Sequence, residues 1–306
     1  MALGLCCEWA EAHPKKGLVN LLVARHLQLG RFNKGHYTPA QIKQTYVDNL
    51  QNLLELLPII QKSGIRFFRL SSSIFPLFDK VSPDTYQNDQ IASLLKKAGD
   101  FFLTHQFRVT THPAQFVVLS SDDSAVVDNA VKEMNYHGWV FDQMGLPRTP
   151  YYSINVHGGK GGRALALIKT IQKLPDTSRL RITLENDEFA YNVKDLAVVS
   201  QITQTPIVFD SHHHSFNDAG MPVGEAMELA ISTWGGVKPT THLSNTALEH
   251  RSATSVTKRR AHSDYIDNIP EKQLEAYQKG RIDIEIEAKA KNLALFQMAK
   301  KFGLTV

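Results

Sequence analysis

The chain has 306 residues, of which 42% are hydrophobic and 21% charged, and its formal net charge is +4. This composition is typical of a globular protein and excludes a disordered chain, and the apolar runs are too short to cross a bilayer. The start of the chain has no basic segment and meets Glu8 early, so we expect no secretory signal. The two cysteines, Cys6 and Cys7, are adjacent in one strand, which disfavours a disulfide and favours the reducing cytoplasm.

In chain order, short runs rich in β-branched and aromatic residues alternate with segments of helical periodicity. The expected strands cover residues 3–7, 65–70, 108–111, 151–157, 180–187, 206–210, 238–243 and 282–288. The expected helices cover residues 38–64, 89–104, 124–143, 163–173, 193–203, 223–233 and 289–302. Thr38 and Pro39 are typical of a helix start, whereas Pro58 predicts a kink or an early end. A long loop, residues 8–37, is expected after the first strand.

This alternation, without a linker or a low-complexity segment, predicts one fold: a single (β/α)8 TIM barrel of the α/β class. Barrels of about 250 residues or more form one unit, so residues 1–306 are expected to form a single domain.

Residues with metal-ligand chemistry stand at the C-terminal ends of six different expected strands. They are His112, His157, Glu185, Asp210, His242 and Glu287. Any one of them alone is better explained as an ordinary polar residue at a strand end. In a barrel these ends converge on one face, where catalytic groups lie. The set therefore predicts a metal site at the C-terminal face of the strands.

The stretch from Pro206 to His214, PIVFDSHHH, is the most conspicuous of these strand ends. Asp210 and His213 offer the oxygen and nitrogen ligands that suit zinc, manganese or iron. We expect His212 and His214 to support the site or contact the substrate. The six strand-end residues together with His213 and His262 are more ligands than one ion binds. Glu185 is therefore expected to bridge two ions. Two such ions can hold both oxygens of an in-line displacement at phosphorus, which favours phosphodiester hydrolysis.

Basic residues are frequent in two loops that are expected on the same face. They are Lys15, Lys16, Arg25, Arg31 and Lys34 in the first loop, and Arg251, Lys258, Arg259 and Arg260 after the seventh strand. Such residues are usually just solvated. Beside a site for several metal ions, however, they indicate a surface for a phosphate backbone.

Seven motifs, in this order, resemble those of the UV damage endonuclease family, and the resemblance runs from about residue 3 to about residue 291. They are FRLSSSIFP (68–76), THPAQF (111–116), VHGG (156–159), LENDE (184–188), PIVFDSHHH (206–214), THLSN (241–245) and IEAKAK (286–291). The resemblance implies a TIM barrel related to endonuclease IV, with two or three divalent ions, typically Mn²⁺, although Zn²⁺ or Mg²⁺ would also suit. It implies nicking of duplex DNA directly 5′ to a UV photoproduct, which leaves a 3′-hydroxyl and a 5′-phosphate.

The resemblance also implies roles for single residues. The metal ligands would be His112, His157, Glu185, Asp210, His213, His242, His262 and Glu287, with Glu185, Asp210, His242 and Glu287 catalytic. Gln115 and Phe116 would probe the duplex at the damage, although ordinary loop packing explains Phe116 equally well. Arg259 and Arg260 would contact the DNA.

The chain departs from the family pattern at three positions. Where the family has a lysine that is thought to be carboxylated, this chain has Thr240, and Lys238 lies two residues deeper on the same strand face. Leu5 and Trp9 replace a tyrosine and an asparagine that contact distorted DNA in the family. We expect Leu5 and Trp9 to contact the DNA at these two positions, and we expect the changes to affect lesion preference more than ion binding.

The leading hypothesis is a monomeric, cytoplasmic endonuclease that acts on damaged double-stranded DNA and does not associate with membranes. A metal-dependent sugar isomerase or epimerase is one alternative, since such enzymes use similar barrels but need fewer metal ligands. A barrel that binds damaged DNA and has lost or altered its catalysis is the other.

Overall fold

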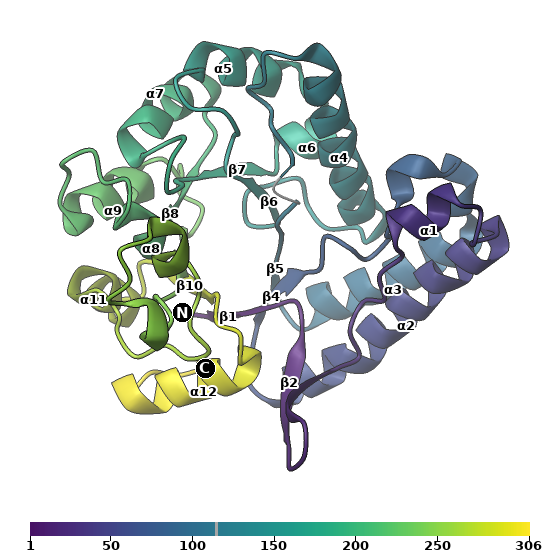
Figure 1. Cartoon of the computed structure of the whole chain (residues 1–306), viewed down its shortest axis with the longest axis horizontal. Helices are drawn as coiled ribbons and strands as arrows, with labels where there is room; N and C mark the ends of the chain where they lie inside the picture. The colour runs from purple at the N-terminus through teal and green to yellow at the C-terminus, as the bar shows by residue number, and fades with distance from the viewer. Residues whose placement is uncertain (114–115) are drawn as a thin grey trace.

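The protein is described from a computed structural model, which covers residues 1–113 and 116–306. Eight parallel strands form a closed barrel in the order β1-β10-β9-β8-β7-β6-β5-β4, and helices surround it (Figure 1). The strands are β1 (Leu3–Cys6), β4 (Phe67–Leu70), β5 (Arg108–Thr111), β6 (Ser153–Val156), β7 (Ile182–Glu185), β8 (Ile207–Asp210), β9 (Thr240–Leu243) and β10 (Asp283–Ile286). The predicted TIM barrel is confirmed.

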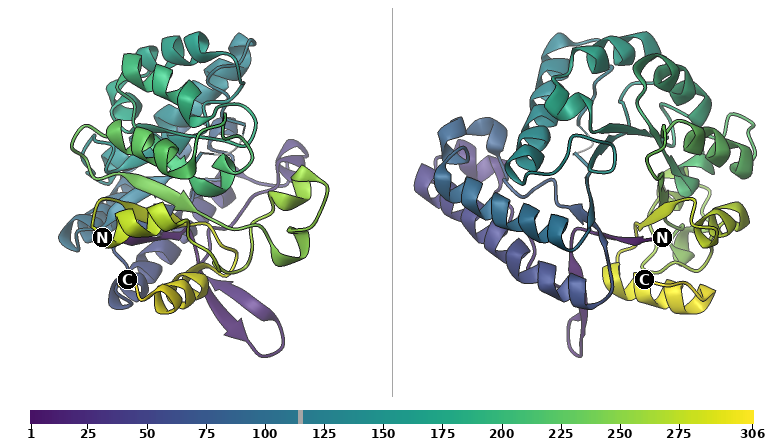
Figure 2. Two further views of the ribbon diagram at one scale, coloured as in Figure 1. Left: turned by 90° about the vertical axis from the view of Figure 1, so that its left-hand side faces the viewer. Right: turned by 180° about the vertical axis from the view of Figure 1, so that it is seen from behind.

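The outer layer consists mainly of eight helices, and Figure 2 shows this layer from the side and from behind. They are α2 (Pro39–Lys62), α3 (Asp89–Thr104), α4 (Ser124–Gln143), α5 (Ala164–Lys173), α7 (Val193–Thr203), α9 (Val223–Ser232), α11 (Glu271–Gln278) and α12 (Lys291–Phe302). Shorter helices lie in the loops: α1 (Leu29–Asn33), α6 (Asp176–Arg179), α8 (Ser211–His214) and α10 (Val256–Arg259). Single 3₁₀ turns occur at Phe78–Lys80, Pro83–Thr85 and Leu248–His250. Of the eight long helices, α11 is the one that the sequence did not predict.

Helix α2 begins where the sequence predicts, but Pro58 does not end it early. The Thr38 side chain accepts a hydrogen bond from the backbone of Gln41, whose side chain accepts one from the backbone of Thr38. Pro58 lies inside the helix, which continues to Lys62. An interior proline costs about 3 kcal/mol, but the last turns bury several leucine and isoleucine side chains, each of which contributes about 1.5–3 kcal/mol.

The segment expected to be a loop after β1 contains an antiparallel hairpin, formed by β2 (Trp9–His13) and β3 (Gly17–Leu21). The hairpin projects from the barrel (Figures 1 and 2). Its base is fixed to α12, because the Asn292 amide exchanges hydrogen bonds of 2.6 and 3.1 Å with the backbone of Ala10. Trp9 also packs edge-on against Phe296, with 6.1 Å between ring centroids.

Charged residues close the barrel at the amino-terminal ends of its strands. This end is opposite the C-terminal strand ends, where the sequence predicts the metal site. The Asp283 carboxylate lies 3.0 Å from Nη1 of Arg108 and 2.9 Å from Nζ of Lys238. Arg108 also donates a hydrogen bond to the backbone carbonyl of Lys238. Lys238 is therefore held at the end of the barrel opposite the predicted metal site. Throughout the described chain, every helix is too short or too polar to cross a membrane.

Candidate metal centre

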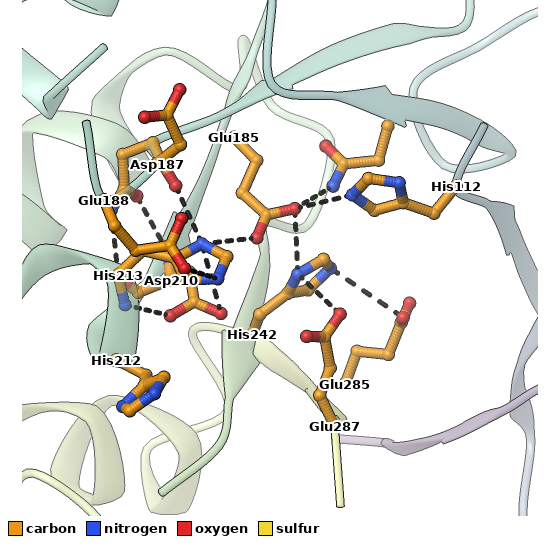
Figure 3. Close-up of polar contacts among 12 residues, drawn as sticks. His112, Glu185, Asp187, Glu188, Asp210, His212, His213, His242, Glu285 and Glu287 are labelled. Carbon is orange, nitrogen blue, oxygen red and sulfur yellow. Dashed lines mark hydrogen bonds and ion pairs between the residues drawn. The ribbon is translucent and has the colours of Figure 1, made fainter. Parts of the chain in front are cut away.

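Seven of the eight predicted ligands lie together at the C-terminal ends of the barrel strands (Figure 3). They form three groups in which the possible ligand atoms lie within 4.8 Å of one another: His112 with His157 and Glu185, Glu185 with Asp210 and His213, and Asp210 with His242 and Glu287. The parallel register explains part of this arrangement, because Asp210 of β8 is paired with His242 of β9. Glu185 and Asp210 each belong to two groups and thus link all three, and a fourth group outside the predicted set, Cys6 with Glu285 and Glu287, shares Glu287 with them.

Glu185 lies at the centre of the cluster, at the end of β7, and is completely buried (Figure 3). Its carboxylate lies 3.2 Å from Nε2 of His112, 3.1 Å from Nδ1 of His213 and 3.1 Å from Nδ1 of His242. The side-chain amide of Asn155, on the neighbouring strand β6, donates a hydrogen bond of 2.5 Å to it. One carboxylate is therefore shared by three imidazoles from three different segments of the chain.

The turn after β8 positions Asp210 and His213. Asp210 is the N-cap of the single-turn helix α8, and its Oδ1 accepts a hydrogen bond of 2.7 Å from the backbone of His213. Nδ1 of His213 lies 3.0 Å from the carbonyl oxygen of Asn186. The sequence Asp-Ser-His-His-His thus converts the end of a strand into one helical turn, which orients two of the candidate ligands.

The other two histidines of this turn contact the main chain. Nε2 of His212 lies 3.4 Å from the carbonyl oxygen of Arg260, and Nε2 of His214 lies 2.9 Å from that of Met221. Figure 3 shows His212 apart from the central carboxylates.

His262 lies beside the three groups, and within the described part of the chain it belongs to none of them. Its Nδ1 is 3.8 Å from the Glu287 carboxylate, and it lines the same cavity as His112, His157 and His213. It is thus the peripheral member of the predicted set.

Two charged residues in the cluster had no role in the sequence-based prediction. The Arg69 guanidinium pairs with the Glu285 carboxylate. It also lies 2.5 Å from Oε1 of Glu287 and 3.2 Å from Nε2 of His242. Glu285 is fully buried and also accepts a hydrogen bond of 2.7 Å from Thr110. The sequence contains a signal for both residues as members of the site. Arg69 interrupts an apolar strand, and Glu285 shares a strand face with Glu287.

The buried carboxylates alter the protonation of the histidines. Burial by itself would lower the pKa of His242, but Glu185, Glu285 and Glu287 raise it to about 9 from its ordinary value of 6.5. The pKa of His213 is likewise raised despite burial, by Asp210 and Glu185. The pKa of Glu185 is lowered, since the neighbouring imidazoles outweigh its burial. The cluster without ions therefore holds protonated imidazoles against carboxylates.

The donor atoms of this cluster fit divalent ions. The atoms Glu185 Oε1, Asp210 Oδ2, His157 Nδ1 and His242 Nδ1 are buried and form no hydrogen bond to any residue that the structure describes. Buried polar atoms without hydrogen bonds are costly. Glu185 Oε1 and His242 Nδ1 each lie 3.1 Å from an atom of the opposite kind of charge, and a bound ion would satisfy all four atoms. Imidazole nitrogens with carboxylate oxygens are the ligands of zinc, manganese and iron. The residues present could therefore hold metal ions.

The cluster lies in an open cavity of about 770 Å³. Among the residues predicted to contact DNA, Arg260 lines this cavity, whereas the Arg259 guanidinium lies over the ring of Phe216 at 5.7 Å. Phe116 is exposed. Gln115 lies outside the described residues.

The structure corrects the expectation for Leu5. Its side chain is 1% exposed and packs in the hydrophobic core, because it belongs to the fully buried strand β1. It is therefore not available to contact DNA in the free protein. Trp9, at the base of the hairpin, is half-buried and packs against the core.

Comparisons with known proteins show the family of this chain. A family model described as UV-endonuclease UvdE matches residues 2–305. A UV DNA damage endonuclease from Deinococcus radiodurans is 35% identical over 301 residues, which cover 93% of this chain and 94% of that protein. A UV DNA damage endonuclease from Nostoc sp. is 33% identical over 299 residues, which cover 93% of this chain and 89% of that protein.

Two solved structures match the fold of this chain to different degrees. The crystal structure of SacUVDE matches with a TM-score of 0.80 at 25% sequence identity and full coverage of both chains. A D-psicose 3-epimerase from Clostridium cellulolyticum H10 matches with a TM-score of 0.56 at 10% identity, covering 94% of this chain and 85% of that one, and so shares the fold alone. The chain therefore belongs to the UV-endonuclease UvdE family.

Proposed function

We propose that this protein is a metal-dependent DNA repair endonuclease. It nicks duplex DNA 5′ to UV photoproducts and other distorting lesions, and it leaves a 3′-hydroxyl and a 5′-phosphate. Residues 1–306 act as one domain, as a monomer in the cytoplasm. The observation that carries the proposal is the set of three linked ligand groups at one end of the barrel, in a chain whose curated relatives are named UV DNA damage endonucleases.

The number of ligand groups favours two or three divalent ions, and the proposed ion is Mn²⁺. Glu185 and Asp210 would each contribute to holding the ions in two groups, since each lies in two groups. His242, Glu287 and the remaining histidines would complete the ligand set. Ions held there would supply a nucleophilic water near neutral pH and would stabilise charge on the phosphoryl group. Asn155 would keep Glu185 in place through its hydrogen bond of 2.5 Å.

The rim of the cavity would bind the DNA. Arg260, which lines the cavity, would contact a phosphate, and the exposed Phe116 would stack at the lesion. Gln115 would hydrogen-bond an unpaired base, a role that rests on the family resemblance.

The proposal is tested by incubating the purified chain with three duplexes, which carry a UV photoproduct, an abasic site or no damage. Each is assayed with Mn²⁺ and with a chelator, and the products are mapped to the nucleotide. We expect nicking directly 5′ to the lesion, with Mn²⁺ alone and not with the chelator. Equal cutting of the undamaged duplex, or no cutting of any duplex, would contradict the proposal. Epimerisation of a ketose by a chain with one tightly bound ion would instead support the sugar epimerase alternative.

A further inference from the structure

An aromatic side chain, Phe189, stands exposed at the rim of the metal cavity. It follows Glu188 in the loop after β7, lines the cavity, and is 65% exposed. Single exposed apolar side chains are common, and Phe189 stands out among those of the described residues because it is the one that lines this polar cavity.

The backbone that carries Phe189 is held in one conformation. The buried Asp187 carboxylate accepts hydrogen bonds from the backbone of Phe189 at 2.7 Å, of Ala190, and of Tyr191 at 3.3 Å. The backbone of Asp187 in turn donates to the carbonyl of Tyr191 at 2.9 Å. Gly161 packs behind the loop so closely that a Cβ atom there would lie 2.6 Å from the carbonyl oxygen of Ala190. The ring is therefore presented by a fixed loop, which reduces the entropy lost on binding.

A guanidinium lies against the same ring. Cζ of Arg260 is 4.1 Å from the centroid of the Phe189 ring, a cation–π contact. Nε of Arg260 donates a hydrogen bond of 2.7 Å to the Glu188 carboxylate, which fixes the guanidinium in place. The positive charge thus lies over one face of the ring, and the exposed remainder of the ring is open to a second planar group. A nucleotide offers the matching pair, a base to stack and a phosphate to bind.

We propose that Phe189 is a stacking site for a nucleobase of the damaged strand, and that Arg260 binds a phosphate of the same segment. This inference rests on the proposed function and adds to it a recognition site that is separate from the metal ligands. Lesions provide the base, because nucleotides at damaged positions are more easily unstacked than those in intact duplex. The site is not expected to discriminate between base types, since every base has a face that can stack.

The test is DNA binding by the full chain in chelating buffer, so that no cutting occurs. The probe is a duplex with one UV photoproduct and, beside it, a 2-aminopurine in an unpaired position. Its fluorescence is high while the base is unstacked and falls when it stacks on an aromatic ring. We expect Phe189→Ala to weaken binding of this duplex about 10- to 100-fold and to abolish the quenching. Phe189→Tyr keeps the ring and should bind and quench like the unaltered chain.

Leu165→Ala is the matched control, since Leu165 is 73% exposed on α5 and does not line the cavity. It should leave binding and quenching unchanged. Unchanged binding and quenching by Phe189→Ala would overturn the stacking site, as would an equal loss of affinity for an undamaged duplex. In either case, nicking by the unaltered chain would leave the proposed function standing. If the unaltered chain neither bound nor nicked damaged duplex, the proposed function would fail as well.

Discussion

At the scale of single residues, the site has more negative than positive permanent charge. The carboxylates are Glu185, Glu188, Asp210, Glu285 and Glu287, and the guanidiniums that pair with them are Arg69 and Arg260. Buried carboxylates are costly unless they are paired. In the absence of ions, protonated His242 and His213 supply part of the missing positive charge. Divalent ions would replace these protons.

This replacement predicts that Mn²⁺ binding releases protons. With a pKa of about 9, His242 is protonated at pH 7, whereas coordination requires the neutral imidazole. Apparent Mn²⁺ affinity should therefore rise with pH and level off above about pH 9. Isothermal titration calorimetry at pH 7, in two buffers of different ionisation enthalpy, measures the release. An observed enthalpy that is the same in both buffers would argue against it.

At the scale of elements, a buried arginine holds helices to the barrel strand that carries Glu185. Arg181 precedes β7 and is completely buried. Its guanidinium donates hydrogen bonds to the Asp142 carboxylate of α4 at 2.8 Å and to backbone carbonyls of Leu146 at 2.5 Å and Thr177 at 2.7 Å. These hydrogen bonds thus connect the N-terminal end of β7 to α4 and α6, which keeps the strand in register.

Removing the charge of Asp142 should therefore destabilise the protein. Asp142→Asn leaves the Arg181 charge buried without its carboxylate, and we expect a loss of about 3 kcal/mol in the free energy of unfolding. Asp176→Asn is the control, since its partner Arg179 is exposed, and it should cost less than about 1 kcal/mol. Urea denaturation monitored by circular dichroism measures both. Equal losses would show that the Arg181 network does not hold β7.

The elements that the sequence predicts correctly are those with strong local signals. Strands such as β8 are apolar runs that end in a candidate ligand, and the start of α2 can be predicted from Thr38 and Pro39. The hairpin was missed because β2 and β3 are largely exposed and have no buried face to impose a pattern. Helix α11 was missed because its short sequence, EKQLEAYQ, is mostly polar.

The candidate site was predictable as a set of residues but not as a geometry. The convergence of strand ends in a barrel brings His112, Glu185 and Asp210 together, and sequence position is enough to see this. The pairing of Arg69 with Glu285 depends on contacts across the barrel interior, which no local pattern reveals. The burial of Leu5 was missed for the same reason, because it depends on strands that are distant in the sequence.

At the scale of the whole molecule, the two ends of the barrel have different roles. One end is closed by Arg108, Lys238 and Asp283, and the other opens into the cavity with the ligand groups. The hairpin and the loop that contains α10 project on one side of the molecule (Figure 2, left). Because both segments follow C-terminal strand ends, that side is the proposed DNA-binding face.

The number of linked ligand groups predicts the metal content of the whole chain. We expect two or three Mn²⁺ ions per chain after reconstitution and gel filtration, measured by inductively coupled plasma mass spectrometry. Asp210→Asn should lower this number, because Asp210 belongs to two groups. Glu133→Gln, which alters a carboxylate on α4 that pairs with His137, should not. A single ion in the unaltered chain would contradict the linked site and favour the sugar epimerase alternative.

The most direct test of the central claim is the nicking of one UV-damaged duplex by Glu185→Gln in the presence of Mn²⁺, with Glu133→Gln and the unaltered chain assayed in parallel. Glu185 links two ligand groups and contacts three imidazoles, so its neutralisation should abolish metal-dependent nicking while circular dichroism shows an intact fold. Glu133→Gln should nick at the rate of the unaltered chain. Full activity of Glu185→Gln would contradict the assignment of this cluster as the active site.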